Sequence, residues 1–546
     1  MTSTSSKPRY AVIVGLGRTG LSCARYLHAR GWRLAVTDTR QSPPELGRLG
    51  EIDPGIPVKV GGLDVALLAG ADVVVASPGV SLAEPFFVEA RRLGIEIVGD
   101  IELFARAVDA PVVGITGTNG KSTVTTLVGR MAERAGLRVR VGGNLGEPAL
   151  NLLEPMTRGS GLAGGGAGAA GASAAGVGAA GAGPVGAGAA GAGLASATAA
   201  TAAAAAAGGA IGAMPDAAGV APGSAAAVAS AAAASAAAGA WQPPQLYVLE
   251  LSSFQLEATS SLALKAAAVL NVTPDHLDRY ASVEEYAAAK ARIFERCETA
   301  VINLDDPLVV AMPRPGQKTL GFSLQASIGA DYACQVADTT LRRPSHPTMR
   351  GGDWWLTRKG EPLLALSAMK IKGLHNAANA LAALALGEAL GLDMQAMLDE
   401  LITFPGLPHR SQWVAEIGGV TYINDSKGTN VGATVAAVSG MQGPLVMIAG
   451  GDGKNQDFSE LADIFRGKVR HTVLIGRDAA AIARVVKGVC TFETCATLEE
   501  AVRAAAKAAQ PGDTVLLSPA CASLDMFRDY THRGAVFTQA VKELAA

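Results

Sequence analysis

The stretch GITGTNGKST, Gly114 to Thr123, decides how the rest of the sequence is interpreted. It follows a short apolar run, Pro111 to Val113, and precedes a helical pattern from Val124 to Arg134. A strand, a glycine-rich turn and a helix in this order are typical of a phosphate-binding loop, because glycines let backbone N–H groups approach an anion and the helix N-terminus adds positive potential. The sequence therefore predicts a nucleotide site in the middle of the chain.

Individual residues of this loop have expected tasks. We expect Lys121 to contact terminal phosphates and a hydroxyl of Ser122 or Thr123 to hold Mg²⁺. The spacing departs from the standard pattern, since Ile115 occupies the place of the first glycine, and an ordinary glycine turn is the alternative. The surrounding strand and helix favour nucleotide binding. The residues expected to bind it are Gly117, Thr118, Asn119, Gly120, Lys121, Ser122 and Thr123.

Length and charge limit the class of protein. The chain has 546 residues, which allows several domains. A formal net charge of −2 without long basic runs argues against nucleic-acid binding. The six cysteines form no metal-type pair, which indicates reduced thiols in a cytoplasmic protein. Residues Met1 to Lys7 are polar and lack the apolar core of a signal peptide.

One tract of low complexity, Arg158 to Ala240, consists almost wholly of alanine and glycine. It carries no charged residue between Arg158 and Asp216. Alanine is only weakly apolar and the glycines are frequent, so we expect a disordered insertion rather than a membrane span, and no chemistry within it.

The first hundred residues show a second glycine pattern. A strand pattern over Tyr10 to Val14 runs into Gly15-Leu16-Gly17-Arg18-Thr19-Gly20, and the next strand, Arg33 to Thr37, ends at Asp38. This matches a dinucleotide fingerprint and makes an NAD-dependent dehydrogenase one alternative. The same loop can hold any diphosphate, and Asp38 any ribose or uridine edge. Thr39, Arg40 and Ser77 also follow strand ends, where ligands of open α/β sheets bind.

Three polar residues of the middle region need an explanation. Glu250 interrupts an apolar strand pattern, Tyr247 to Leu251, and a buried carboxylate is costly unless paired or bound to metal. We prefer a metal, with a structural salt bridge as the alternative. His276 follows another strand and is either an ordinary loop histidine or a group facing the same phosphate. Lys290 lies among alanines in a helix expected from Val283 to Arg296, so it is either a solvated helix lysine or part of a tight site.

The last part of the chain repeats strands that end in polar residues. Four such strands alternate with helices from Val420 to Leu517. This predicts a parallel sheet with one active edge. Lys454 follows one strand, and a surface turn lysine is the alternative to a binding residue there. The fold class is thus α/β, with three domains at 1–108, 109–404, including the insertion at 158–240, and 405–546.

Taken in order, the motifs resemble those of the Mur ligase family, over nearly the whole chain except the insertion. The stretches that carry this resemblance are GTNGKS, LELSSFQLE, NVTPDHLDRY, HNAANALAA, PHR, NDSKGTN, GGDGKNQDF and SPACASLDMF. The resemblance implies an N-terminal Rossmann-like domain that binds UDP, a central P-loop ATPase domain with a mostly parallel sheet, and a C-terminal Rossmann-like domain that binds the amino acid and ATP.

The resemblance also implies an activity. The chain looks most like the branch that adds D-glutamate to UDP-N-acetylmuramoyl-L-alanine, using ATP and an acyl phosphate, in the cytoplasmic synthesis of peptidoglycan precursors for cell shape and division. Another Mur-type ligase and a folylpolyglutamate synthase are alternatives, although the latter lacks the UDP-binding domain. A nucleotide-gated binding module without activity is the non-enzyme alternative. We expect a monomer.

The site residues implied by the resemblance divide by ligand. Lys121, His276 and Lys290 are the expected catalytic residues. Ser122 and Glu250 hold one Mg²⁺, and His276 binds a second together with a carbamylated Lys290. Asn379, Arg410 and Asp425 contact ATP. The residues expected to bind UDP-N-acetylmuramoyl-L-alanine or D-glutamate are Gly15, Leu16, Gly17, Arg18, Thr19, Gly20, Asp38, Thr39, Arg40, Ser77, Asn144, Lys427, Thr429, Lys454, Ser523 and Tyr530.

Overall fold

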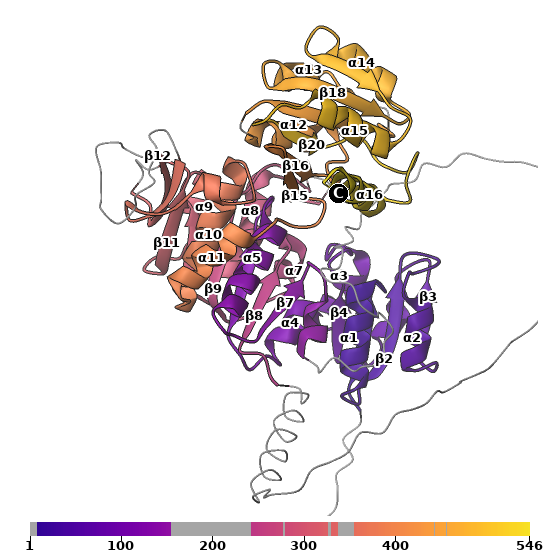
Figure 1. The fold of residues 1–546 in the computed structure, drawn as a ribbon. Helices are drawn as coiled ribbons and strands as arrows, with labels where there is room; N and C mark the ends of the chain where they lie inside the picture. Colours follow the sequence, from indigo (N-terminus) through magenta and orange to yellow (C-terminus); the bar gives the residue numbers. More distant parts are fainter. Residues whose placement is uncertain are drawn as a thin grey trace, which may run out of the picture. The chain divides into compact units, whose positions relative to one another are not determined.

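The computed structural model describes residues 8–153, 242–276, 279–325, 329–336, 354–441, 443–454 and 456–545. Their strands form three sheets, one after another along the chain (Figure 1). The predicted insertion at 158–240 lies outside the described residues. No helix among those described is both long and apolar enough to cross a bilayer.

The N-terminal sheet has the order β3-β2-β1-β4-β5, and all of its described pairs are parallel. Parallel neighbours need crossovers, which the helices between the strands supply. The elements are β1 (Tyr10–Val14), α1 (Arg18–His28), β2 (Arg33–Asp38), α2 (Leu46–Ile52), β3 (Val58–Val60), η1 (Val65–Leu68), β4 (Val73–Ala76), α3 (Pro85–Arg92), β5 (Glu96–Gly99) and α4 (Asp100–Ala105).

The middle sheet has the order β14-β13-β12-β11-β10-β9-β6-β8-β7. It is parallel from β7 to β12 and antiparallel at β13 and β14. Its strands are β6 (Val112–Thr116), β7 (Val139–Gly143), β8 (Leu246–Glu250), β9 (Leu264–Val269), β10 (Cys297–Asn303), β11 (Lys318–Ser323), β12 (Tyr332–Val336), β13 (Trp354–Arg358) and β14 (Glu361–Ala365).

Two groups of helices cover this sheet. Helices α5, α10 and α11 pack together on one face and share a core with alternate residues of β6, β8 and β9. The other residues of these strands pack with α8 and η3. The bounds are α5 (Lys121–Arg134), η2 (Ala149–Leu153), α7 (Ser253–Glu257), α8 (Val283–Ala291), η3 (Arg292–Phe294), α9 (Pro307–Val310), η5 (Leu366–Ala368), α10 (Leu374–Leu390) and α11 (Met394–Thr403).

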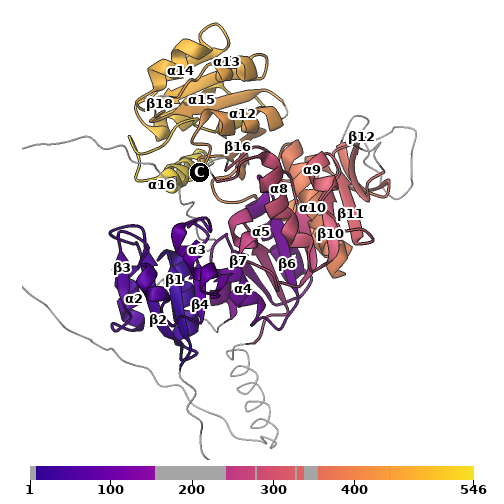
Figure 2. The same ribbon diagram turned by 180° about the vertical axis from the view of Figure 1, so that it is seen from behind.

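The C-terminal sheet has the order β15-β16-β20-β17-β18-β19, antiparallel only at β15. Helices α12, α13 and α14 cover one face, and α15 and α16 cover the other (Figure 2). The bounds are β15 (Gln412–Ile417), β16 (Val420–Asn424), α12 (Val431–Gly440), β17 (Leu445–Gly450), α13 (Glu460–Phe465), β18 (Val469–Ile475), α14 (Ala479–Val486), β19 (Thr491–Thr494), α15 (Leu498–Ala508), β20 (Thr514–Leu517) and α16 (Tyr530–Leu544).

Two local expectations need correction. Glu250 is the last residue of β8, not a residue in the middle of a strand, because Leu251 and Ser252 lead into the capping box of α7. The helix expected from Val283 to Arg296 is α-helical only to Ala291 and then tightens into the 3₁₀ turn η3. The end position places the Glu250 carboxylate at the edge of the sheet where ligands of parallel sheets bind.

Candidate active site around the phosphate loop

The phosphate loop connects β6 to α5 at the carboxyl edge of the middle sheet. Gly117 and Gly120 have φ values of 146° and 84°, in the region that only glycine adopts without strain. A Cβ at Gly120 would lie 2.3 Å from Oδ1 of Asn379, so α10 packs directly against the loop. The loop glycines and the predicted ATP residue Asn379 are therefore neighbours.

Two lysines share one carbonyl of this loop. The Nζ of Lys121 donates to the carbonyls of Gly117 at 2.9 Å and Thr118 at 2.8 Å. The Nζ of Lys290 donates to the same Gly117 carbonyl at 3.0 Å. Burial lowers the pKa of Lys121, and burial together with the Lys121 charge lowers the pKa of Lys290 to about 7. The Lys290 amine thus loses its proton more easily than an ordinary lysine.

Glu250 lies beside the first turn of α5. Its side chain accepts hydrogen bonds from the Ser122 hydroxyl at 2.7 Å and the Asn144 amide at 2.7 Å. The residue is only 3% exposed, and both of these donors are neutral. A buried carboxylate next to a hydroxyl, without a direct ion pair, fits a divalent cation, because Mg²⁺ prefers hard oxygen ligands.

His276 projects from the loop that follows β9. It has a φ of 54°, unusual for a residue with a side chain, and its side chain is 43% exposed. Its ring lies 4.9 Å from that of Phe254 and 5.9 Å from that of Tyr286, measured between ring centroids. Lys290 Nζ lies 4.3 Å from the same Tyr286 ring. The structure thus places both His276 and Lys290 in contact with the ring of Tyr286.

Sequence reasoning missed the residue that braces the tip of the phosphate loop. The side chain of Asn271 accepts from the backbone N–H of Asn119 at 2.8 Å and donates to its carbonyl at 3.2 Å. The Thr118 hydroxyl adds hydrogen bonds with the backbone of Thr273. The loop before His276 and the phosphate loop are therefore joined. The sequence signal for a role of Asn271 was its position as the first polar residue after the apolar run of β9.

The N-terminal glycine loop is held from two sides. The Ser77 hydroxyl donates to the Gly15 carbonyl at 2.9 Å. Asp38 accepts from the Leu16 N–H at 2.7 Å and from the Arg40 guanidinium at 2.7 and 2.9 Å. Although burial opposes it, the hydrogen bonds from Arg40 and Leu16 lower the pKa of Asp38. The predicted residues Gly15, Asp38, Arg40 and Ser77 form one cluster.

A third group of predicted residues surrounds the ends of β16 and β20. Asp425 is 9% exposed and accepts from the Ser411 N–H at 3.0 Å and the Ser518 hydroxyl at 2.8 Å. Burial raises its pKa to about 6. Lys427 Nζ lies 4.2 Å from the centre of the Tyr530 ring. Burial and the neighbouring Arg410 charge lower the pKa of Lys427, which indicates a positive region suited to an anion.

Arg533, which carried no sequence-based expectation, ties two of these loops together. It is fully buried and donates to the Ser426 hydroxyl and carbonyl and to the carbonyls of Cys521 and Ala522. Burial lowers its pKa to about 10. Ser523, beside Ala522, is 3% exposed, whereas Lys454 is exposed in its turn. The only sequence signal for the role of Arg533 was the position of an arginine inside the apolar pattern of the last helix.

The remaining predicted residues make fewer contacts. Arg18 forms a 3.6 Å ion pair with Glu147, and Thr39 is exposed. The Thr429 N–H donates to the Lys427 carbonyl. Gly20 lies so close to Gly15 that a Cβ there would be 2.0 Å from the Gly15 carbonyl oxygen. That close approach explains why the fingerprint requires glycine at this position.

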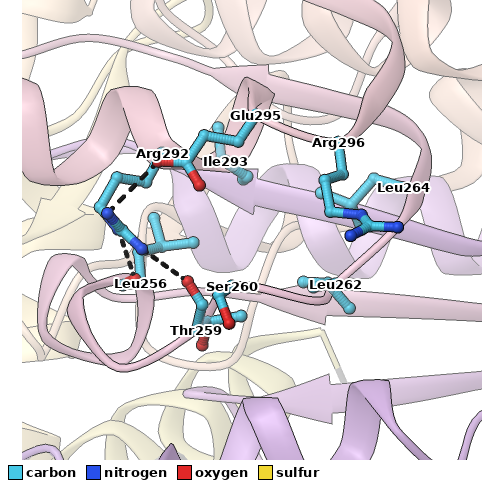
Figure 3. A pocket seen from close by; sticks show the side chains of 9 residues that line it. All are labelled: Leu256, Thr259, Ser260, Leu262, Leu264, Arg292, Ile293, Glu295 and Arg296. Atoms are coloured by element: carbon cyan, nitrogen blue, oxygen red, sulfur yellow. Dashed lines mark hydrogen bonds and ion pairs between the residues drawn. The ribbon is translucent and has the colours of Figure 1, made fainter.

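A separate hollow beside α7 contains none of the predicted site residues (Figure 3). Within it Arg292 donates to the carbonyls of Leu256 at 2.9 Å and Thr259 at 2.7 Å, and pairs with Glu295 at 3.3 Å. Because its guanidinium is engaged in these contacts, Arg292 braces the end of α7 rather than presenting a charge to a ligand.

Comparison with known proteins agrees with this three-part geometry. Family models described as the "Mur ligase MurD-like, N-terminal domain", "Mur ligase middle domain" and "Mur ligase, glutamate ligase domain" match residues 9–99, 228–387 and 409–521. A UDP-N-acetylmuramoylalanine--D-glutamate ligase of Methylococcus capsulatus is 43% identical over 98% of this chain and 95% of its own length.

Two further proteins extend the comparison. The UDP-N-acetylmuramoylalanine--D-glutamate ligase of Nitrosococcus oceani is 43% identical over 98% of this chain and 96% of its own length. The crystal structure of a UDP-N-acetylmuramate-alanine ligase from Thermotoga maritima aligns with a TM-score of 0.48 and 15% identity, over 98% of this chain and 99% of that one. The predicted fold class and family are confirmed by the family models and the two full-length relatives: the chain belongs to the Mur ligase family.

Proposed function

We propose that the chain is an ATP-dependent ligase that joins D-glutamate to UDP-N-acetylmuramoyl-L-alanine in the synthesis of peptidoglycan precursors. The observation that supports it best is the convergence of Lys121, Lys290 and the Ser122–Glu250 pair on one phosphate loop, in a chain similar over its length to ligases of that name. An NAD-dependent dehydrogenase leaves this convergence without a purpose.

The chemistry has two steps. A carboxylate oxygen of the alanyl substrate attacks the γ-phosphorus of ATP, and the bond from that phosphorus to the β–γ bridging oxygen breaks. ADP departs, and the substrate becomes an acyl phosphate. The amine of D-glutamate then attacks the acyl carbon, and phosphate and a proton depart as the amide forms. Positioning and charge neutralisation accelerate both steps. Lys121 turns from the Gly117 and Thr118 carbonyls toward the phosphates, exchanging neutral acceptors for charged ones.

The donor atoms around the loop are suited to Mg²⁺. Ser122 and Glu250 would hold one ion through oxygen, and His276 with Lys290 a second. When bound, Mg²⁺ would neutralise charge on the phosphate oxygens. A lysine ammonium cannot bind a metal cation. A pKa of about 7, however, leaves much of the Lys290 amine neutral. The neutral nitrogen can attack the carbon of CO₂ and then lose a proton, which gives an anionic carbamate.

The other two clusters would bind the ends of the substrates. The glycine loop, with Asp38, Arg40 and Ser77, holds the uridine diphosphate. Asn379, Arg410 and Asp425 contact ATP. D-Glutamate carries two carboxylates, which the cations of Lys427 and Lys454 and the hydroxyls of Thr429 and Ser523 are suited to bind. The enzyme acts as a cytoplasmic monomer in this proposal.

The test is phosphate release with purified protein, ATP and Mg²⁺. We expect release only when UDP-N-acetylmuramoyl-L-alanine and D-glutamate are both present, and none when L-glutamate, L-alanine or a diamino acid replaces D-glutamate. Release with a pteroate substrate, or with another amino acid instead of D-glutamate, would overturn the assignment. Phosphate release independent of either substrate would also contradict it.

A further inference from the structure

Arg279 contacts three parts of the site that the chemistry above does not connect. Its Nη1 donates to the Pro78 carbonyl at 3.0 Å, on the N-terminal loop that follows β4. Its Nη2 donates to Glu257 at 3.1 Å, at the end of α7. Its backbone N–H donates to the His276 carbonyl at 2.9 Å. One residue thus joins the loop after β4, the helix after the Glu250 strand and the expected catalytic histidine.

The Pro78 segment that accepts from Arg279 also contacts the N-terminal glycine loop, which is expected to bind the uridine diphosphate. Ser77, the residue before Pro78, donates its hydroxyl to the Gly15 carbonyl at 2.9 Å. A Cβ at Gly15 would lie 2.9 Å from the Ser77 Cβ, so the two loops touch closely. A ligand that orders the Gly15 loop therefore also orders the backbone that accepts from Arg279.

The other contacts lead to His276. The Arg279 guanidinium lies 4.1 Å from the centre of the Phe254 ring, whose centroid is 4.9 Å from that of His276. Tyr280 donates to Glu257 at 2.5 Å and its backbone N–H donates to the His276 carbonyl at 3.0 Å. Arg279 and Tyr280 thus hold the His276 backbone in its positive-φ conformation, which costs free energy and persists only where the surroundings enforce it.

We propose that Arg279 is a positioning residue that couples binding of the uridine diphosphate end of the substrate to the placement of His276 beside the phosphate loop. The side chains of Arg279 and Glu257 are only 13% and 21% exposed, so solvent screens their contact weakly. Binding energy from the remote end of a long substrate accelerates the reaction only if it is transmitted to the reacting centre. Arg279 provides the contact for that transmission. This inference rests on the proposed ligase function.

The experiment pairs a substitution with a shortened substrate. Phosphate release with D-glutamate is measured for wild type and Arg279→Ala, using either the complete UDP substrate or 1-phospho-N-acetylmuramoyl-L-alanine, which lacks the uridine monophosphate portion. With the complete substrate we expect Arg279→Ala to lower kcat about 30-fold, since small misplacements of reacting groups cost up to about 100-fold. With the shortened substrate we expect a loss below about threefold, because little remote binding is left to transmit.

Arg292→Ala is the matched control. Arg292 also braces α7, through the Leu256 and Thr259 carbonyls, and its hydrogen bonds reach neither Pro78 nor His276 (Figure 3). We expect its effect on kcat to be the same for both substrates. Arg279→Lys keeps a cation near Phe254 but cannot bridge both acceptors. With the complete substrate Arg279→Lys should lower kcat about fivefold, and with the shortened substrate the loss should again be smaller. This variant keeps the test available if Arg279→Ala does not fold.

Equal kcat losses for the two substrates in both Arg279 variants would overturn the coupling and leave Arg279 a structural residue. A change confined to KM, with kcat unchanged, would overturn it as well, because it would mean that binding alone is affected. A wild-type protein inactive on the complete substrate would instead refute the proposed function, so the two failures are distinguishable.

Discussion

The Gly117 carbonyl is the point where the two lysines of the phosphate loop meet. Both side chains donate to it, at 2.9 and 3.0 Å, and burial together with the Lys121 charge lowers the pKa of Lys290, burial being the larger cause. The charges of Glu250 and Asp275 raise the pKa of both lysines but do not offset their burial, so the site favours a further anion beside them. We infer that a bound phosphate supplies it.

A first prediction concerns Lys121. Lys121→Ala should lower kcat by about 10³-fold, comparable to losing a preorganised donor at developing charge, while the Kd for the UDP substrate stays within about threefold. The measurements are phosphate release and calorimetry. Lys265→Ala, which removes an exposed lysine paired with Glu298 at 2.6 Å, is the control and should retain full activity. Loss of substrate binding together with turnover would show that the nucleotide and UDP sites are wrongly separated.

A second prediction concerns the proposed carbamate on Lys290. Protein freed of CO₂ should lose activity and regain it on addition of bicarbonate, with a new ¹³C resonance from labelled bicarbonate. Because the pKa is about 7, the amine is mostly neutral at about pH 8 and mostly protonated at about pH 6, so the labelling should be weaker at the lower pH. Lys290→Ala should give no such resonance; a Lys290→Ala enzyme with normal rates would refute the metal-ligand role.

Among the elements, α4 carries two buried acids whose pKa values are shifted in opposite directions. Asp100 is 1% exposed and accepts from the Gln255 side chain at 3.0 Å, and burial raises its pKa to about 6. Glu102 is also buried, but the N–H groups of Ser260 and Ser261 and the Arg106 side chain overcome that burial and lower its pKa to about 2. The first acid opposes the contact between α4 and the segment around α7, and the second stabilises it.

The third prediction follows from this contrast. A raised folded pKa means that the folded state binds more protons between about pH 4 and pH 6, so the Asp100 contribution to stability falls across that window and stays low above it. Asp100→Asn should therefore increase the free energy of unfolding at about pH 8 by about 3 kcal/mol at most, and by about half of that at about pH 5, with the thermal midpoint rising accordingly. Glu102→Gln should lower the midpoint at both pH values. Equal shifts of Asp100→Asn at the two pH values would contradict the linkage.

The strands and glycine loops were accessible from sequence, since their signals are local. Tyr10–Val14 begins and ends where its apolar run predicts, and the strands expected between Val420 and Leu517 begin with β16 at Val420 and end with β20 at Leu517. Of the two alternatives for Lys290, a solvated helix lysine or part of a tight site, the 1% exposure of the residue matches the second. The hydrogen bond from Ser122 places Glu250 beside the phosphate loop, although the sequence pattern predicts Glu250 in the middle of its strand rather than at the end.

The bracing residues were not accessible in this way. Asn271 reaches Asn119 and Arg533 reaches Ser426 across more than 100 residues of sequence, and Arg279 reaches Pro78 across 201. These contacts depend on how strands and loops distant in sequence come together in the fold, which no local periodicity encodes. The domain limits at 108 and 404 fall between the three sheets and stay a prediction, as do the roles given to the individual site residues.

For the molecule as a whole, the fourth prediction concerns the alanine–glycine tract. Deleting Gly161 to Gly239 should leave kcat and the KM values within about twofold, because composition gives the tract no groups for chemistry and surface insertions cost little loop entropy. The variant's steady-state kinetics and melting curve are the measurements. A folded but inactive deletion would show that the tract contributes to the reaction.

The strand order of the middle sheet has a consequence for biosynthesis. β8 lies between β6 and β7, yet residues 154–241 separate it from them in the chain. At the usual pace of translation, about 90 residues take about 5 to 20 s to emerge from the ribosome. For that time β6 and β7 are synthesised without the strand that pairs with both of them, so their apolar residues are available to chaperones or to other nascent chains.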